Sequence, residues 1–595
     1  MSEFEVAHVN DLKDGEMKEV AVGGLGKALL SKIDGEFFAT SHLCPHYKAP
    51  LSKGTLSSDG RIMCPWHGAC FRAQTGDIED APSVDGLASF KVTVRGDKVF
   101  IKANPDEIKA GRKVPIVRKF KCTPKRAVIV GGGAGGLVAA ETLRKEGFDG
   151  EILLLSREPY LPVDRPKLSK ALNIDATKIA LRDAEHFKNM NINVRLATIV
   201  KAVDTKAKTV TLESGESVTY NHLVLATGGD PRVLPINGKD LGNIFVIRDV
   251  KDANAIGEAL PSNATTKRNV VIVGSSFIGM EAASILVKQA NVTVIGMEKV
   301  PFERVLGNKV GDALMKLNIA NGVKFELEAL VDHYLPSASN PKQVGFVVLK
   351  SGKKIPADVV ILGAGVFPQT TYLKDSGITL DRDGGITVTA GMQVPGAEDV
   401  YAVGDIARYP YHLTGESVRV EHWNVAQNQG RVAALNIVAK EHGKAETASV
   451  EFKQVPYFWT VQFGKSVRYA GHATSFDSVV IQGSLDHASE AGLSFAAFYF
   501  RKGVMVAVCS VAKDPVVSHV SELMRLGKAP TEAQIHGLDV LKLPLKSNEK
   551  FVPPKKASAS SPDNTIFLIA AGLAGLIAVL APIAYYIRDK AAASR

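Results

Sequence analysis

The pattern of apolar and polar positions changes several times along the chain. Residues 1–105 consist of short segments in which apolar and polar residues alternate, such as FKVTVRGDKVFIKA, separated by Gly, Asp and Pro. A period of two is typical of strands that bury one face. The pattern predicts a small β domain over residues 1–105, followed by a charged, proline-containing linker over 106–124.

From about residue 125 the pattern becomes strand, glycine-rich turn and helix. It occurs in AVIVGGGAGGLVAAETLRKEG and again in NVVIVGSSFIGMEAASILVKQA. Such a unit places a pyrophosphate at the N-terminus of the helix. The duplication predicts two Rossmann-like domains of α/β class, the first formed by 125–250 and 371–445 and the second by 251–370.

The last part of the chain contains three further segments. Residues 446–545 mix strand patterns with one helical pattern near 519–526 and predict an α+β domain, and 546–565 form a Pro/Ser/Lys-rich linker. Residues 566–587 are uncharged and mostly apolar, and as a helix they would extend about 33 Å, against about 30 Å for a hydrocarbon core. We expect a single-pass, tail-anchored membrane protein with its globular part in the cytosol, at the outer mitochondrial or endoplasmic-reticulum membrane. The alternative for 566–587 is a buried apolar helix.

Composition narrows the classes of function. A formal charge of +10 over 595 residues, without a dense Lys/Arg block, argues against nucleic-acid binding. Five cysteines are too few and too unevenly spaced for a secreted disulfide framework, and no signal peptide is visible at the N-terminus. A reducing compartment is expected.

Four residues in the first domain form a metal-binding pattern. Cys44 and His46 form a CxH pair, and after seventeen intervening residues Cys64 and His67 form a CxxH pair. Two thiolates on one iron and two imidazoles on the other is the ligand set of a Rieske [2Fe-2S] cluster, whereas a Cys2His2 zinc site is the alternative. The segment CPWHGACFRAQTGDIEDAP resembles the second cluster-binding loop of Rieske ferredoxin-like domains.

The first nucleotide domain has a complete glycine fingerprint, formed by Gly131, Gly133 and Gly136. Glu158 follows the second strand, one place later than the usual ribose-binding acid. The motifs EPYLPVDRPKLSK, LVLATGGDPR and VYAVGDIAR resemble the ferredoxin-reductase-like flavoproteins that include apoptosis-inducing factor. The resemblance implies that this domain binds FAD.

The same resemblance assigns roles to individual residues. It implies that Asp405 holds the ribityl chain of FAD, that Arg165 and Lys170 lie beside the cofactor, and that Trp423, in HWNVAQNQ, lies beside the flavin. In PYFWTVQFG, Trp459 is a second candidate for approach to the ring. For both tryptophans a purely structural place in the core is the alternative.

The second fingerprint points to a nicotinamide dinucleotide. Gly274 and Gly279 frame a turn whose middle glycine is replaced by serine. The resemblance pairs Glu281, on the following helix, with Lys170 next to the flavin. Glu298 is the candidate ribose-binding acid, although Gly296 stands in the more usual place. An acid there repels a 2′-phosphate, and no arginine immediately follows it, so NADH is favoured over NADPH.

Together these features predict an NAD(P)H-dependent oxidoreductase that passes electrons through FAD to its own Rieske [2Fe-2S] cluster. No CxxxxC pair follows the first fingerprint, so disulfide reduction is not expected to be its main chemistry. The chain has no segment for a terminal oxygenase, so a separate acceptor is implied, and the apolar tail favours one at a membrane. The alternative is a redox-sensing or cell-death effector similar to apoptosis-inducing factor.

Overall fold

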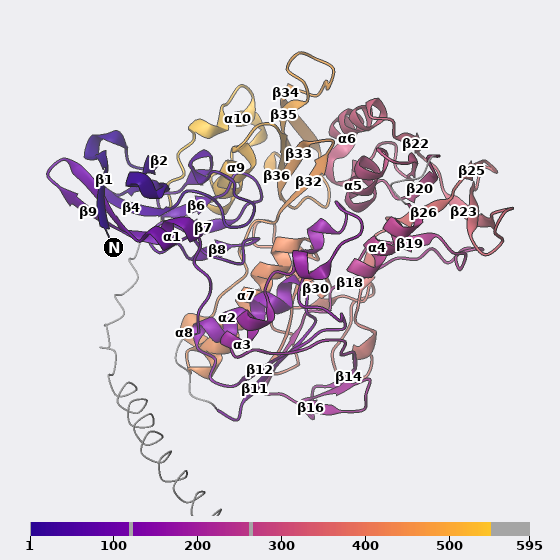
Figure 1. Cartoon of the computed structure of the whole chain (residues 1–595), viewed down its shortest axis with the longest axis horizontal. Coiled ribbons are helices and arrows are strands. Elements are labelled where there is room, and N and C mark those ends of the chain that lie inside the picture. The colour runs from indigo at the N-terminus through magenta and orange to yellow at the C-terminus, as the bar shows by residue number, and fades with distance from the viewer. Residues whose placement is uncertain (1, 118–122, 261–265, 549–595) are drawn as a thin grey trace, which may run out of the picture. The chain divides into compact units, whose positions relative to one another are not determined.

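The N-terminal β pattern folds into two antiparallel sheets in the computed structural model, which describes residues 2–117, 123–260 and 266–548 (Figure 1). The larger sheet has six strands in the order β1-β10-β9-β4-β3-β2, and the smaller has four in the order β5-β6-β7-β8. The large sheet comprises β1 (Ser2–His8), β2 (Met17–Ala21), β3 (Lys27–Ile33), β4 (Glu36–Ser41), β9 (Ser89–Arg95) and β10 (Lys98–Ala103). The small sheet comprises β5 (Thr55–Leu56), β6 (Arg61–Met63), β7 (Cys70–Arg72) and β8 (Ile78–Asp80).

The predicted linker 106–124 begins as ordered structure attached to this first domain. Helix α1 (Pro105–Ala110) starts at Asn104, whose side chain accepts a hydrogen bond from the Asp106 amide. Lys113 and Gly86 then exchange two backbone hydrogen bonds of 2.8 and 3.0 Å. The chain therefore leaves the β domain later than its composition indicated.

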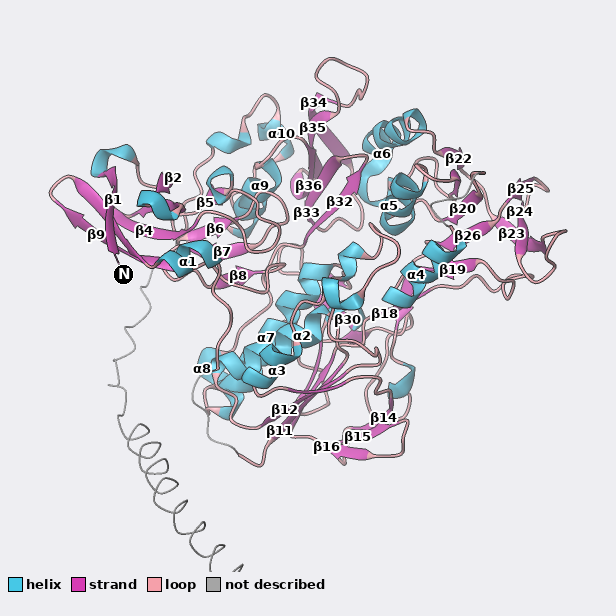
Figure 2. Ribbon diagram, viewed as in Figure 1, coloured by secondary structure: helices cyan, strands magenta, loops and turns pink. Residues whose placement is uncertain are grey.

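The first nucleotide domain is built on a parallel five-stranded sheet in the order β13-β12-β11-β17-β29. Because β29 comes from a later segment, the chain returns to this domain after completing the second one. Helices α2 and α7 pack against each other beside this sheet (Figure 2). A Cβ at Gly430 of α7 would lie 2.2 Å from the Gly135 carbonyl of α2, so the contact requires glycine.

The elements of this domain are β11 (Arg126–Val130), α2 (Ala134–Glu146), β12 (Glu151–Leu155), α3 (Ala184–Asn189), β13 (Asn193–Arg195), β14 (Val200–Asp204), β15 (Thr209–Leu212), β16 (Ser217–Thr219), β17 (His222–Leu225), β18 (Gly229–Pro231), β28 (Ile386–Thr387), β29 (Val400–Ala402), β30 (Ala407–Pro410), β31 (Ser417–Val418), α7 (Trp423–Glu441) and α8 (Ala445–Ala448).

The second nucleotide domain repeats the plan, with a parallel sheet in the order β19-β26-β20-β21-β22. Strand β20 leads through the second fingerprint into α5, as the sequence predicted. Its elements are β19 (Ile244–Val246), α4 (Val250–Ala259), β20 (Asn269–Val273), α5 (Phe277–Leu286), β21 (Asn291–Ile295), α6 (Glu303–Ala320), β22 (Lys324–Glu326), β23 (Val331–Pro336), β24 (Val344–Leu349), β25 (Lys354–Pro356), β26 (Val359–Leu362) and β27 (Val366–Pro368).

The C-terminal domain is an antiparallel sheet in the order β32-β33-β36-β35-β34, followed by α9. Its elements are β32 (Tyr457–Gln462), β33 (Lys465–Gly471), β34 (Ser478–Ser484), β35 (Ser494–Arg501), β36 (Val504–Val511), α9 (Val516–Arg525) and α10 (Glu532–Ile535). Part of the predicted linker 546–565 and the whole predicted span 566–587 lie outside the described residues. Within the described part of the chain, no helix is long and apolar enough to cross a membrane.

The N-terminal β domain is packed against the C-terminal domain through a common apolar core. Met63 and Cys70 are buried together with Tyr457, Val517 and Val520. Ion pairs and hydrogen bonds also cross this boundary: Arg61 to Glu522, Arg525 to Asp59, Arg468 to the Trp66 carbonyl, Ser518 to the Cys64 carbonyl, and the Ser58 amide to the Leu545 carbonyl. Shared burial of this kind gives a docked domain.

A second boundary joins the N-terminal domain to the first nucleotide domain. Arg182 is 7% exposed and contacts Asp85 at 2.7 Å, the Val84 carbonyl at 2.8 Å and Glu141 of α2 at 2.6 Å. Asn428 of α7 also accepts a hydrogen bond from the Ala81 amide. Together the two boundaries hold the domain with the CxH and CxxH pairs against the C-terminal domain and the first nucleotide domain.

Candidate functional site: a nucleotide cavity beside a cluster site

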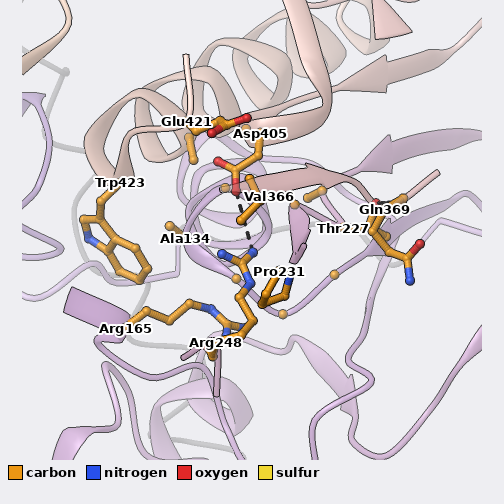
Figure 3. Close-up of a pocket in the computed structure, with 18 of the residues that line it drawn as sticks. Ala134, Arg165, Thr227, Pro231, Arg248, Val366, Gln369, Asp405, Glu421 and Trp423 are labelled. Carbon is orange, nitrogen blue, oxygen red and sulfur yellow. Dashed lines mark hydrogen bonds and ion pairs between the residues drawn. The ribbon is translucent and has the colours of Figure 1, made fainter. Parts of the chain in front are cut away.

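A cavity of about 750 Å³ lies where the two nucleotide domains meet the C-terminal domain. Its size falls within the range of about 300–1,000 Å³ of ligand pockets. In Figure 3, Asp405, Glu421 and Trp423 approach the cavity from one side, and Arg165 and Arg248 approach from the other.

The glycines of the first fingerprint form a cradle at one end of the cavity. A Cβ at Gly131, whose φ is +116°, would lie 2.3 Å from the Ala226 carbonyl, and one at Gly136 would lie 1.9 Å from the Gly131 carbonyl. At Gly133, the residue before α2, a Cβ would meet nothing within 4 Å. The open space at this helix N-terminus fits a pyrophosphate.

Beyond the glycine turn, charged side chains line the cavity. Glu158 contacts Arg165, which also donates a hydrogen bond of 2.8 Å to the Arg248 carbonyl. The guanidinium of Arg248 lies 3.6 Å from Asp405 (Figure 3). Burial, together with the charge of Arg165, lowers the pKa of Arg248. Sequence reasoning missed Arg248, because it stands in no motif and reaches Asp405 only through the fold.

Glu421, His422 and Trp423, where the chain enters α7, all line the cavity. Burial and the neighbouring Asp405 raise the pKa of Glu421, and burial lowers the pKa of His422 to about 3, so this imidazole is neutral. Trp423 follows at the first turn of the helix and lines the cavity. Of the three, only Trp423 was predicted from the sequence, since the other two carry no signature beyond their place next to it.

Lys170 and Glu281, predicted as a pair, are in contact across the two nucleotide domains. The ammonium lies 2.8 Å from the carboxylate of Glu281, which is 4% exposed. The same carboxylate accepts hydrogen bonds from Ser169 and, at 2.8 Å, from Thr460 of the C-terminal domain. Three donors compensate the buried charge.

The second fingerprint forms an equally tight turn. A Cβ at Gly274 would lie 2.3 Å from the Gly363 carbonyl, and one at Gly279 would lie 2.2 Å from the Gly274 carbonyl. A Cβ at Gly296 would lie 2.5 Å from the Ser275 hydroxyl, so a larger residue at that position would have to displace this side chain. The acid nearest to this position in the sequence is Glu298, two residues later.

Glu298 follows β21 and accepts a hydrogen bond of 3.0 Å from Ser275 of this turn. Its other oxygen lies 3.1 Å from Arg304, whose side chain is 73% exposed. The sequence search considered only an arginine directly after the acid and so missed Arg304. A cation therefore lies at the predicted ribose site together with the acid.

The CxH pair, in the loop after β4, and the CxxH pair, in the loop between β6 and β7, come together in the first domain. The Nδ1 atoms of His46 and His67 lie 3.1 Å apart, and Cys44 and Cys64 are each 1% exposed. A hydrogen bond to Cys64 and burial raise the pKa of the Cys44 thiol, whereas burial of Cys64 is outweighed by hydrogen bonds, from Cys44 first, that lower its pKa.

This donor set fits a [2Fe-2S] cluster of the Rieske type. The thiols form one adjacent pair and the imidazoles another, as two irons with different ligands require. Burial lowers the pKa of His46 to about 4 and that of His67 to about 2. Both rings are neutral near pH 7, which is the form that binds iron.

Trp459, on β32, connects the cluster site with the nucleotide cavity. Its side chain lines the cavity, and its ring centroid lies 4.2 Å from that of His67 and 5.8 Å from that of His46. Tyr457, on the same strand, packs on Gly68, where a Cβ would lie 2.6 Å from its ring. Glycine at this position therefore leaves room for the Tyr457 ring.

Comparisons with known proteins match this arrangement. The family profile described as pyridine nucleotide-disulphide oxidoreductase matches residues 125–430, the Rieske [2Fe-2S] domain matches 2–91, and the reductase C-terminal domain matches 457–541. The chain belongs to the pyridine nucleotide-disulphide oxidoreductase family. Its cofactors are FAD, a [2Fe-2S] cluster and NAD(P)H, and it is an NAD(P)H-dependent flavin and iron-sulfur oxidoreductase, as the motifs predicted.

Individual relatives of this family share much of the chain. Human apoptosis-inducing factor 3 is 42% identical over 543 residues, which are 90% of this chain and 86% of that protein. A ferredoxin reductase from Rhodopseudomonas palustris superposes with a TM-score of 0.64 at 26% identity, covering 70% of this chain and 99% of that one. The reductase chain of a covalent putidaredoxin reductase–putidaredoxin complex gives 0.61 at 28% identity, covering 67% and 93%.

The family name refers to disulphide chemistry, but the described cysteines of this chain form no disulfide and lie outside the nucleotide cavity. Among the described residues, Cys44, Cys64, Cys70 and Cys509 are all free, and none lines the nucleotide cavity. Cys44 and Cys64 belong to the cluster site, and burial raises the pKa of Cys70, which packs in the core shared with the C-terminal domain.

Proposed function

We propose that this chain carries electrons from NAD(P)H, through FAD, to its own Rieske cluster and then to a separate acceptor. When bound, FAD takes two electrons from a nicotinamide and releases them singly, and the cluster accepts one at a time. The observation that supports this route is the position of Trp459, which lines the nucleotide cavity and packs on the ring of His67.

The protein's own residues support the route in two further ways. The buried contacts of Arg182 and Arg61 hold the Rieske domain against the rest of the chain, so the cluster site stays beside the cavity without a diffusing ferredoxin. Lys170, held by Glu281, places a cation at the cavity wall between the two nucleotide domains. Such preorganised charge stabilises developing negative charge at no cost in reorganisation.

The comparisons favour the same reading. One relative, from Burkholderia cepacia, is named as the ferredoxin–NAD(+) reductase component of an anthranilate 1,2-dioxygenase system, and one solved structure is a covalent putidaredoxin reductase–putidaredoxin complex. In this protein a Rieske domain is part of the same polypeptide as the reductase domains. The fusion replaces an encounter between two proteins by a docked contact.

The test is anaerobic mixing of the full-length protein with NADH, with the flavin followed by absorbance and the cluster by electron paramagnetic resonance. We expect the flavin to bleach and a reduced Rieske signal to follow. Trp459→Leu should slow reduction of the cluster and leave reduction of the flavin unchanged. In Trp459→Phe, which keeps an aromatic ring, the rate of cluster reduction should lie between those of the wild type and Trp459→Leu. A cluster that stays oxidised while the flavin is reduced would refute the internal route.

The proposal includes the acceptor and its place. The apolar run 566–587 supports a membrane anchor, so we infer that the acceptor lies at the same membrane, with the globular part on the cytosolic side. Fractionation of cells that express the full chain, or a chain ending at 548, tests this. Full-length protein in the membrane pellet and truncated protein in the supernatant are expected, and equal partition would reject the anchor.

A second candidate function is redox sensing in cell death. It is favoured by the 42% identity to the human protein named apoptosis-inducing factor 3. A sensor should keep oxidised nicotinamide bound to the reduced protein for minutes, whereas a reductase should release it within each turnover. The lifetime of the long-wavelength charge-transfer band after mixing with NADH separates the two.

A further inference from the structure

The C-terminal domain covers the second cluster loop. Tyr457 packs on Gly68, Arg468 donates a hydrogen bond of 3.0 Å to the Trp66 carbonyl, and Ser518 donates one of 2.9 Å to the Cys64 carbonyl. With Trp459 against His67, this side of the cluster site faces the interior of the protein. A separate acceptor must therefore approach from elsewhere.

The first cluster loop presents an aromatic ring to the outside. Tyr47 stacks on His46 with ring centroids 4.0 Å apart and an angle of 16° between the ring planes, and it is 38% exposed. Its hydroxyl donates a hydrogen bond of 2.8 Å to Asp164 of the first nucleotide domain. The ring is thus held in one place, with one face on a cluster ligand and part of its surface in solvent.

The exposed charge around this ring is positive. Lys48 is exposed next to it, and the ammonium of Lys167, whose side chain is 40% exposed, lies 5.8 Å from the ring centroid. The nearby acid, Asp164, is 5% exposed and is engaged by both Tyr47 and Lys167. A partner that approaches Tyr47 therefore meets the ammonium groups of Lys48 and Lys167, whereas the carboxylate of Asp164 is buried and already paired.

We propose that the surface formed by Tyr47, Lys48 and Lys167 is the site where electrons leave the cluster, and that it docks an acceptor protein with an acidic surface. This inference rests on the proposed internal route. In each event one electron passes from the reduced cluster to the acceptor, so that the cluster is oxidised and the acceptor is reduced by one electron. Electrostatic steering of an acidic partner raises the association rate and falls with salt.

Two inorganic acceptors of opposite charge test the site on the full-length protein. We expect ferricyanide, an anion, to oxidise the NADH-reduced cluster faster at low salt than at high salt. For hexaammineruthenium(III), a cation, we expect the opposite: oxidation that is slower at low salt than at high salt. Lys48→Glu should slow the reaction with ferricyanide about fivefold at low salt and much less above about 0.1 M, where the screening length is about 10 Å. Tyr47→Leu should slow both acceptors, whereas Tyr47→Phe should slow neither.

The matched control is Lys354→Glu, a charge reversal at an exposed position of β25 in the second nucleotide domain, which should change neither rate. The rate through the cluster is obtained by subtracting that of Cys64→Ser, which lacks the cluster and reports direct transfer from the flavin. Binding is measured without turnover by the redox-inert, paramagnetic anion hexacyanochromate(III). It should broaden the ¹⁹F signal of Tyr47 in fluorotyrosine-labelled protein, and less so in Lys48→Glu.

The outcomes separate this inference from the proposed function. If NADH fails to reduce the cluster in the wild type, the internal route itself is refuted. If the cluster is reduced normally, but Lys48→Glu and Tyr47→Leu react and bind like the wild type, the exit site is wrong and the internal route stands. Loss in both variants, with Lys354→Glu unchanged, supports the exit site.

Discussion

Replacing Arg182 by methionine tests whether the Rieske domain is held in place by buried charge. The change keeps much of the side-chain volume but removes the guanidinium from Asp85, which is 3% exposed, and Glu141, which is 6% exposed. Removing one partner of a buried ion pair costs about 3–5 kcal/mol. Each acid keeps a second partner, Arg112 at 3.2 Å and His186 at 2.7 Å, so the lower end, about 3 kcal/mol, is expected.

Urea unfolding measures this loss. With a slope of about 1–3 kcal/mol per molar urea, 3 kcal/mol lowers the midpoint by about 1–3 M. The visible circular dichroism of the cluster reports the Rieske domain, and flavin fluorescence reports the nucleotide domains. We expect Arg182→Met to shift the cluster transition to lower urea than the flavin transition, because the domain boundary is lost first.

Two further variants make the result decisive. Arg95→Met removes an exposed ion pair with Glu3 inside the Rieske domain and should cost at most about 1 kcal/mol. Adding Glu141→Gln to Arg182→Met removes one uncompensated charge and should recover part of the loss. A midpoint for Arg182→Met equal to that of Arg95→Met would show that the buried charges do not hold the domain.

Three other predictions follow from the same contacts. Burial raises the pKa of Glu141, but its bonds to His186 and Arg182 outweigh this and lower it. The stability that Glu141 contributes is therefore present above its unfolded pKa of about 4.3 and is lost as pH falls through the lower folded value. Unfolding followed by intrinsic fluorescence between pH 7 and 3 should show this loss, and stability that does not fall over this range would contradict the prediction. Glu298→Gln removes the acid and frees Arg304, so the NADPH-to-NADH ratio of kcat/KM should rise about tenfold, or about 1.4 kcal/mol; an unchanged ratio would place the ribose elsewhere. Glu281→Gln removes a charge-assisted hydrogen bond of about 1.5–3 kcal/mol, so flavin reduction by NADH should slow at least tenfold in stopped flow, with FAD content unchanged; a wild-type rate would remove the pair with Lys170 from the machinery.

Local chemistry explains what the sequence predicted well. The strand-turn-helix units around Gly131 and Gly274 were visible because strands, tight turns and helix starts each have a residue pattern of a few positions. The return of the chain to the first nucleotide domain was predicted with the help of family motifs that occur in order, and the structure shows it as the pairing of β29 with β17. The one helix expected in the C-terminal region lay near 519–526, and α9 covers Val516–Arg525.

Other parts of the site had no local signal. Arg248, Glu421 and Arg304 belong to no motif. Arg248 reaches Asp405 only through the fold, whereas Glu421 and Arg304 stand close in sequence to Trp423 and Glu298 but carry no signature of their own. The linker was placed by composition, which does not show that Lys113 pairs with Gly86. The contacts of Arg248 and Lys113 become visible only when the distance between segments is known.

The sequence by itself determined the family, the cofactors and the four candidate cluster ligands, because ligand type, spacing and turn glycines are properties of short segments. Only the tertiary structure decided that the Rieske domain is docked, that Trp459 lies between the nucleotide cavity and His67, and that the Tyr47 hydroxyl is bonded to Asp164 of the first nucleotide domain. The physical reason is that each of these contacts joins segments far apart in the chain. Burial and charge compensation stabilise them, and no periodicity within one segment encodes them.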